Sequence, residues 1–145
     1  MADSKEKAAK QVVDISDFFT KDRKEEGVWH EPVIEGKRIG ILFKVIGSDA
    51  DSAATVFADY DKEIEKLDSV EDPEKKIKGL KEVQARTSAK LVKDIKAQDG
   101  YEALINGEPL AYSEETVYRI FINATSIAAD IISFSRRDGN FMVKK

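Results

Sequence analysis

Apolar side chains between residues 27 and 47 follow the two-residue rhythm of a β-strand. Ile39, Ile41, Phe43 and Val45 alternate with residues that include Arg38, Gly40 and Lys44. A period of two is typical of a strand that buries one face. This stretch is therefore predicted to be one arm of a β-hairpin over residues 27–47.

The other arm of the hairpin is expected in residues 28–34, before an EGKR turn. Pro32 has no amide donor, so it either confines that strand to a sheet edge or interrupts it. A hairpin alone is marginal in water, hence one of its faces should lie on helices. Trp29 is the expected anchor between the hairpin and those helices.

Two helical patterns follow the hairpin. The first is predicted over residues 49–67, with Ser48 as its cap and early aspartates at the positive end of the helix dipole. Its apolar stripe steps by three and four residues: Ala53, Phe57, Tyr60, Ile64 and Leu67. The second is predicted over residues 73–97, because Asp72 followed by Pro73 is a typical helix start. The stripe of the second helix is Ile77, Leu80, Gln84, Thr87, Leu91 and Ile95.

These two helices are expected to pack side by side and antiparallel, because only a short linker joins them. Charge favours the same pairing. Residues 49–68 hold seven acids and two lysines, whereas residues 74–96 hold eight basic residues and three acids, giving net charges of −5 and +5. Each exposed ion pair contributes only about 0.2–1 kcal/mol, so charge selects the orientation more than it supplies stability.

A third helix is predicted over residues 114–135. The loop NGEPLAYS ends at Ser113, a favoured helix cap, and two glutamates follow in the first turn. The helix then shows a broad apolar face: Val117, Ile120, Phe121, Ala124, Ile127, Ala128, Ile131 and Phe134. Asp138 and Gly139 stop it. This helix is the expected centre of the core.

The order of these elements predicts an α+β fold, with an N-terminal hairpin packed on a small bundle of about three main helices. Residues 27–145 are expected to form this single domain. Residues 1–26 are expected to be flexible or loosely docked. Within them, Val12, Ile15, Phe18 and Phe19 fall at helical spacing, so a short helix is expected to dock on the body.

Composition describes a globular chain without an evident catalytic centre. Hydrophobic residues make up 41% and charged residues 36% of the 145 residues, with a net charge of −4, no cysteine and one histidine, His30. A cysteine nucleophile and a usual zinc site are therefore excluded. No catalytic, metal-binding or cofactor-binding residues are predicted, no membrane partner is expected, and His30 is interpreted as a strand side chain.

The basic run in residues 75–96 is the best argument for nucleic acid binding, because cations repeated along a helix can follow phosphates. Lysine dominates this run, no aromatic residue interleaves with it for base stacking, and the acidic helix beside it competes for its charge. Nucleic acid binding is therefore kept only as a third hypothesis.

Three aromatic residues near the ends of the last helix are the candidate partner-binding residues: Tyr112, Tyr118 and Phe141. Exposed aromatics at such positions would indicate a partner surface, although core packing is the favoured role for each of the three taken singly.

The chain resembles the tail assembly chaperones of long-tailed bacteriophages in an ordered series of features. These are EEGVW, a strand pair, charged helices, GEPLAYS, a helix and a closing DGNF. The likeness spans residues 25–141, and its most specific parts are residues 107–113 and 139–141. It implies a non-enzymatic protein that binds the tape-measure protein, keeps it soluble and helps recruit tail-tube subunits. It also implies a location in the cytoplasm of the infected bacterial host and absence from the mature virion.

A second hypothesis remains open beside this one: a structural virion component, such as a tail-completion or connector protein. The sequence leaves open self-association, the contact surface and the host. Family members often have a longer form made by ribosomal frameshifting, and the terminal Lys144 and Lys145 are compatible with a slippery codon pair. Only the nucleotide sequence can test that expectation.

Overall fold

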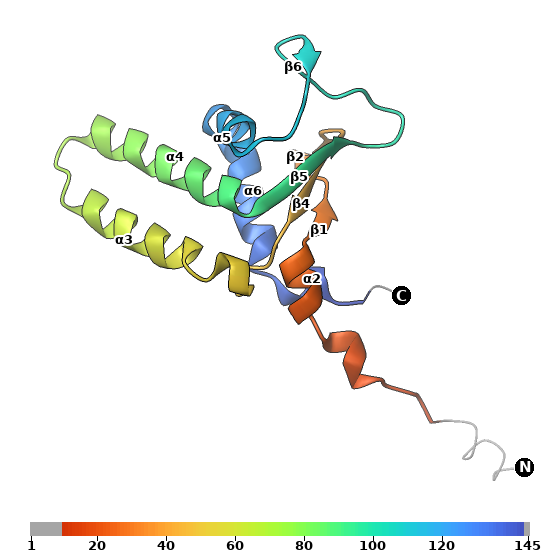
Figure 1. Cartoon of the computed structure of the whole chain (residues 1–145). Helices are drawn as coiled ribbons and strands as arrows, with labels where there is room; N and C mark the ends of the chain where they lie inside the picture. The colour runs from red at the N-terminus through yellow and green to blue at the C-terminus, as the bar shows by residue number, and fades with distance from the viewer. Residues whose placement is uncertain (1–9, 144–145) are drawn as a thin grey trace, which may run out of the picture.

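The computed structural model describes residues 10–143 and shows an α+β fold (Figure 1). Its centre is an antiparallel sheet of three strands in the order β1, β4, β5. These strands are β1 (Val28–His30), β4 (Ile41–Val45) and β5 (Val92–Ala97). Helices cover the face of the sheet that carries the buried side chains of Phe43, Val45 and Ile95.

The predicted hairpin over residues 27–47 is present. β1 pairs with β4, and nearer the turn β2 (Val33–Ile34) pairs with β3 (Lys37–Arg38). Pro32 interrupts the first arm, as the missing amide donor predicts. On the second arm Gly40 breaks the strand with a φ of +75°, and its amide donates to Oε2 of Glu31 at 3.0 Å.

Trp29 is not the anchor that the sequence suggested. It pairs with Lys44 in the register of β1 and β4, and the ammonium of Lys96 lies 4.2 Å from its ring centroid. Successive side chains of a strand point to opposite faces. Since Phe43 and Val45 enter the core, Lys44 and its neighbour Trp29 lie on the opposite face, where the indole packs against two lysines.

The two middle helices are α3 (Val56–Asp68) and α4 (Pro73–Lys90), which run antiparallel side by side (Figure 1). Gly79 of α4 permits their close approach, because a Cβ there would lie 2.5 Å from Cδ2 of Leu67. The predicted charge pairing appears as one ion pair, Arg86 Nη2 to Glu63 Oε2 at 2.7 Å. The Asp72 cap is confirmed, since its side chain accepts from the amide of Glu74.

The predicted start of the first of these helices is wrong. A short 3₁₀ turn, η2 (Asp51–Ala53), comes first, and α3 begins only at Val56. Ser48 does not cap it, because the N-cap position of α3 is Thr55. The amide of Ser48 donates to the carbonyl of Ser135 at 3.0 Å, which holds the loop after β4 against the end of the last helix.

The predicted end of the second helix is also wrong. α4 stops at Lys90, and residues 92–97 form β5, which pairs with β4 through a bulge between Lys44 and Val45. The early part of the predicted stripe is on the surface, with Ile77 54% and Leu80 38% exposed. The buried residues of α4 are smaller and come later: Val83, Ala85, Thr87, Ser88 and Ala89. These small side chains let the last two helices approach closely.

The predicted last helix is two helices, α5 (Glu114–Asn123) and α6 (Thr125–Ser135), which meet at a bend of 115°. Ala124 leaves the helical conformation at φ −131° and ψ 72°. Both helices contact α4, and α6 also reaches β4. Among the described residues no single helix is long and apolar enough to span a membrane; α5 and α6 reach that length and composition only together, across the bend.

A small hairpin that the sequence did not predict precedes α5. Its strands are β6 (Leu104–Ile105) and β7 (Glu108–Pro109). Asn106 and Gly107 connect them, both with positive φ, at +49° and +82°. Asn followed by Gly favours such a tight turn, because both residues tolerate the left-handed conformation.

The core lies between the sheet and helices α4, α5 and α6. Its largest fully buried side chains include Phe43, Phe121, Ile131 and Leu91. The rings of Phe43 and Phe121 lie 5.5 Å apart. The expectation that the last helical region is central to the core is therefore confirmed, although two helices supply it.

The N-terminal part that the structure describes consists of η1 (Ile15–Phe18) and α2 (Lys21–Glu26). The predicted docking of its apolar residues is wrong. Val12 is 91%, Ile15 69% and Phe19 66% exposed. α2 lies against the body, where Gly47 donates its amide to the carbonyl of Lys24 at 3.0 Å. The part of the prediction that concerns residues 1–9 lies outside the described residues.

Candidate partner-binding groove

A surface groove runs along the C-terminal end of α4 and the start of α5. It consists of two adjoining cavities of about 500 and 390 Å³. Tyr118 lines the larger cavity and Tyr112 the smaller one. Ala89, Lys90 and Glu114 line both. Two of the three aromatic residues singled out in the sequence therefore border one continuous surface.

The Ser113 cap positions both tyrosines. Oγ of Ser113 accepts from the amide of Thr116 at 3.0 Å, which fixes the first turn of α5 as the sequence predicts. Tyr112 stands just before this cap in extended backbone, and Tyr118 follows within the helix. Tyr118 packs partly against the core, whereas Tyr112 remains 41% exposed.

The hydroxyl of Tyr112 donates to the carbonyl of Val92 at 3.0 Å. Val92 belongs to β5, an edge strand of the sheet. The backbone amide of Ile95 in the same strand is also hydrogen-bonded, since it donates to Oδ1 of Asp94 at 2.8 Å. Burial first, and then the negative charges of Glu114 and Asp94, raise the pKa of Tyr112 above its ordinary value. Tyr112 therefore stays neutral and keeps its hydroxyl proton at physiological pH.

Charged side chains frame the groove. Arg86 and Lys90 come from α4, and Glu114 and Glu115 from the first turn of α5. Arg86 is held by its ion pair with Glu63. The floor between these charges is the small side chain of Ala89, which is 2% exposed. An apolar floor with aromatic and charged walls suits an amphipathic helix, whose apolar face can enter while its polar flanks meet the rim.

Phe141, the third aromatic residue singled out in the sequence, is not part of this groove. It lies in η3 (Asp138–Phe141) and is 0% exposed, and its ring centroid lies 5.8 Å from that of Phe134 in an edge-to-face arrangement. Burial of this kind makes Phe141 a packing residue that holds the C-terminal turn against α6. Phe141 therefore has the core role that was the alternative to partner binding, and it lacks the exposure that a partner surface requires.

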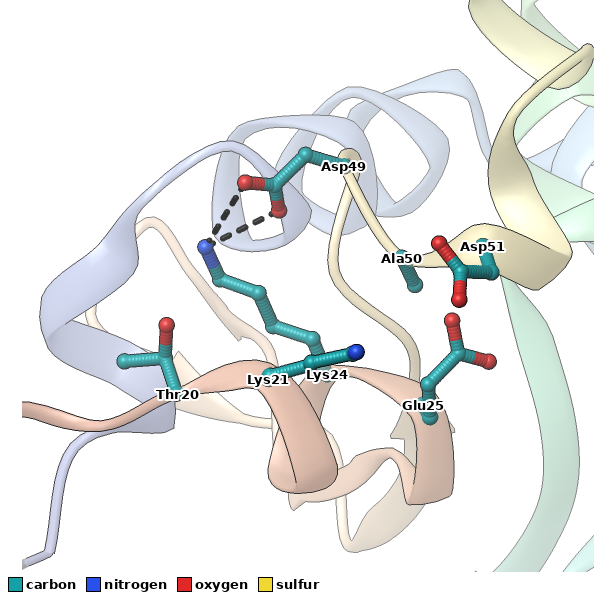
Figure 2. A pocket seen from close by; sticks show the side chains of 7 residues that line it. All are labelled: Thr20, Lys21, Lys24, Glu25, Asp49, Ala50 and Asp51. Atoms are coloured by element: carbon teal, nitrogen blue, oxygen red, sulfur yellow. Dashed lines mark hydrogen bonds and ion pairs between the residues drawn. The ribbon is translucent and has the colours of Figure 1, made fainter.

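A second polar site lies where α2 meets the loop after β4 (Figure 2). The Lys24 side chain is only 7% exposed, yet its ammonium lies 2.9 Å from Oδ1 of Asp49 and 2.7 Å from Oδ1 of Asp138. Its hydrocarbon stem packs on Gly47, where a Cβ would lie 2.3 Å from Cγ of Lys24. We call Lys24, Asp49 and Asp138 the Lys24 cluster. It fastens α2 to both β4 and the C-terminal turn.

Burial by itself lowers the pKa of Lys24, but hydrogen bonds to Asp138 and Asp49 outweigh that effect and the net shift is upward. The hydrogen bond from Lys24 lowers the pKa of Asp49, against an opposing effect of burial. Lys24 and Asp49 therefore stay ionised at neutral pH. Sequence reasoning missed this cluster because Lys24 sits in the charged run KDRKEE, which is typical of a solvated surface.

The single histidine, His30, forms a contact between β1 and α6. Nε2 of His30 lies 2.6 Å from Oδ2 of Asp130, and its ring stacks on Phe134 with centroids 4.0 Å apart. This contact joins β1 to α6, as expected for a strand side chain. Over residues 10–143, no group of three or more histidine and acidic side chains is arranged to hold a metal ion.

Comparisons of the chain with protein-family models, curated proteins and solved structures find no match. The structure itself shows an α+β protein with an open surface groove between α4 and α5.

Proposed function

We propose that this protein is a non-enzymatic tail assembly chaperone of a long-tailed bacteriophage, which binds the tape-measure protein and keeps it soluble. The observation that supports this most is the groove that brings Tyr112 and Tyr118 together over Ala89. A tape-measure protein is expected to expose long apolar helical stripes. A groove with an apolar floor and charged walls is suited to cover one or two turns of such a stripe.

The proposal includes recruitment of tail-tube subunits, residence in the host cytoplasm and absence from the mature virion. An open and partly polar groove favours transient binding, because exposed polar rims contribute less to affinity than a deeply buried anchor. Transient binding is what a chaperone needs if it is to leave before the particle is complete.

The test is co-expression with a tape-measure fragment from the same genome, followed by co-purification and light scattering. We expect the fragment to stay soluble and to co-purify with the wild-type chain. Tyr112→Ala and Lys90→Glu should weaken the complex at least tenfold, because both residues line the groove.

Tyr101→Ala is the matched control, since Tyr101 is 58% exposed but lies outside the groove. Circular dichroism should show that all variants are folded. Loss of solubility or binding with Tyr101→Ala and not with the groove variants would contradict the assignment of the groove. Failure with several fragments, together with detection of the chain in purified virions, would favour the structural-component hypothesis instead.

A further inference from the structure

The described N-terminal segment carries an unusual concentration of exposed apolar side chains. Five large ones occur within residues 12–19, with exposed fractions between 52% and 91%: Val12, Val13, Ile15, Phe18 and Phe19. In Figure 1 this orange-red segment runs away from the body, close to the C-terminal end. We call residues 10–20 the arm. A single exposed apolar residue needs no explanation, but a contiguous group indicates an interaction surface.

The arm also forms one wall of a cavity of about 360 Å³. Val12, Val13 and Phe18 line it from the arm, and Met142 and Val143 line it from the other end of the chain. The two walls are tied together: the amide of Val143 donates to the carbonyl of Asp17 at 3.3 Å. Arg23 Nη1 also donates to the carbonyl of Met142 at 3.0 Å.

Phe19 is next to this cavity in sequence but does not line it, and its side chain is 66% exposed. The same short surface thus presents a projecting aromatic ring and an apolar hollow large enough to receive one. A two-fold interface requires that arrangement, because each copy must supply both the inserted residue and the site that receives it.

We infer that the arm is the interface between two copies of this chain, with Phe19 of each copy inserted into the cavity between arm and C-terminal turn of the other. The exposed apolar area of the five side chains is roughly 600 Å², at the upper end for the largest patch of a monomer. Two such patches pressed together give roughly 1,200 Å² in total, the lower limit of a specific interface.

Charge favours a second copy over a strongly charged partner. Residues 10–20 hold one basic and two acidic side chains, so the arm carries a net charge of only −1, whereas the whole chain carries −4. Two arms of this charge repel each other only weakly, whereas two acidic helices such as α3 would repel each other more strongly. The root of the arm is also fixed, because Lys24 is fastened to Asp49 and Asp138 and Lys93 Nζ donates to the carbonyl of Glu25 at 2.8 Å.

This inference does not depend on the proposed function, since it concerns the chain alone. The test is sedimentation velocity on the full chain from low to high micromolar concentration. We expect a reversible monomer–dimer equilibrium whose dissociation constant rises at least tenfold in Phe19→Ser, which removes the inserted ring, and in Val13→Arg, which blocks the cavity. Ile77→Ser is the control, because Ile77 is 54% exposed on α4 and far from the arm in sequence.

A mixture of the two arm variants gives a sharper result. Phe19→Ser keeps an intact cavity and Val13→Arg keeps an intact ring, so together they can form one of the two insertions. The mixture should associate more tightly than either variant alone. A wild-type chain that remains monomeric throughout would overturn the inference, as would a dimer that Phe19→Ser leaves unchanged. An arm variant that impairs only tape-measure binding, with no wild-type dimer, would assign the arm to that partner.

Discussion

Removing both carboxylates of the Lys24 cluster should destabilise the chain more than the two single changes together. Asp49→Ala or Asp138→Ala leaves the buried ammonium with one partner, so each should cost about 1 kcal/mol. The double variant leaves it with neither. Stripping a buried charge of its partners costs about 3–5 kcal/mol. We expect about 3, because the two aspartates are 68% and 70% exposed and water can reach the vacated positions.

A third substitution separates charge from packing. Lys24→Met keeps the hydrocarbon stem on Gly47 and removes the ammonium, and replacing a buried ion with an apolar side chain of similar volume is often close to neutral. In the wild-type chain it should therefore change the free energy of unfolding by no more than about 1 kcal/mol. In the double variant it should restore about 2 kcal/mol.

The assay is equilibrium unfolding in urea, followed by the fluorescence of Trp29 and by circular dichroism. A change in midpoint at constant slope measures the change in stability. The reasoning is refuted if the double variant equals the sum of the singles, or if Lys24→Met destabilises the double variant further. Either result would mean that the ammonium is hydrated in the folded state and does not need Asp49 or Asp138.

The same cluster sets a pH window. The pKa of Asp49 is lowered by the hydrogen bond from Lys24, so its stabilising contribution is present above the ordinary value of 3.8 and is lost as the pH falls through the lower folded value. The pKa of Lys24 is raised, so its contribution is present below the ordinary value of 10.5 and is lost as the pH rises through the higher folded value. Urea midpoints of wild type and Asp49→Ala should therefore differ least outside that window.

Changes at three positions, Phe121, Ser113 and Tyr112, test the fold and the groove. Phe121→Ala should lose about 3–5 kcal/mol in thermal or urea unfolding, because the ring is fully buried against Phe43; a loss under 1 kcal/mol would contradict its place in the core. Ser113→Ala should lose about 1 kcal/mol through the missing cap, and Ser113→Asp should retain most of it. Tyr112→Phe should lose about 1 kcal/mol or less with its bond to Val92. Ultraviolet titration should place the pKa of Tyr112 above its ordinary value of 10.0, and a lower pKa would contradict its burial beside Glu114.

The features that local chemistry determines could be predicted from the sequence. The hairpin follows from alternating apolar residues, and the Asp72 and Ser113 caps follow from side chains that bond within two or three residues. The groove could be predicted in part for the same reason. Tyr112 and Tyr118 flank a helix cap, so their common location near the start of one helix could be predicted from the sequence alone.

The features that were missed depend on partners distant in sequence. Residues 92–97 continue the helical spacing of α4, but pairing with β4 makes them a strand, so tertiary contacts override the local pattern. No proline or glycine lies at the bend at Ala124 to predict it from the sequence. Phe141 is buried by packing on Phe134, and no residue near it indicates that contact.

The contact between Lys24 and Asp138 joins residues that are 114 positions apart. During synthesis the N-terminal part emerges first, so β1 and β4 can pair while the last helices are still being made. Lys24, at the root of the arm, cannot form its contact that early, because Asp138 is synthesised much later. The contact also closes a long loop, which has an entropic cost. The contact that fixes the root of the arm to the C-terminal turn can therefore form only after Asp138 has been synthesised, well after β1 and β4 can pair.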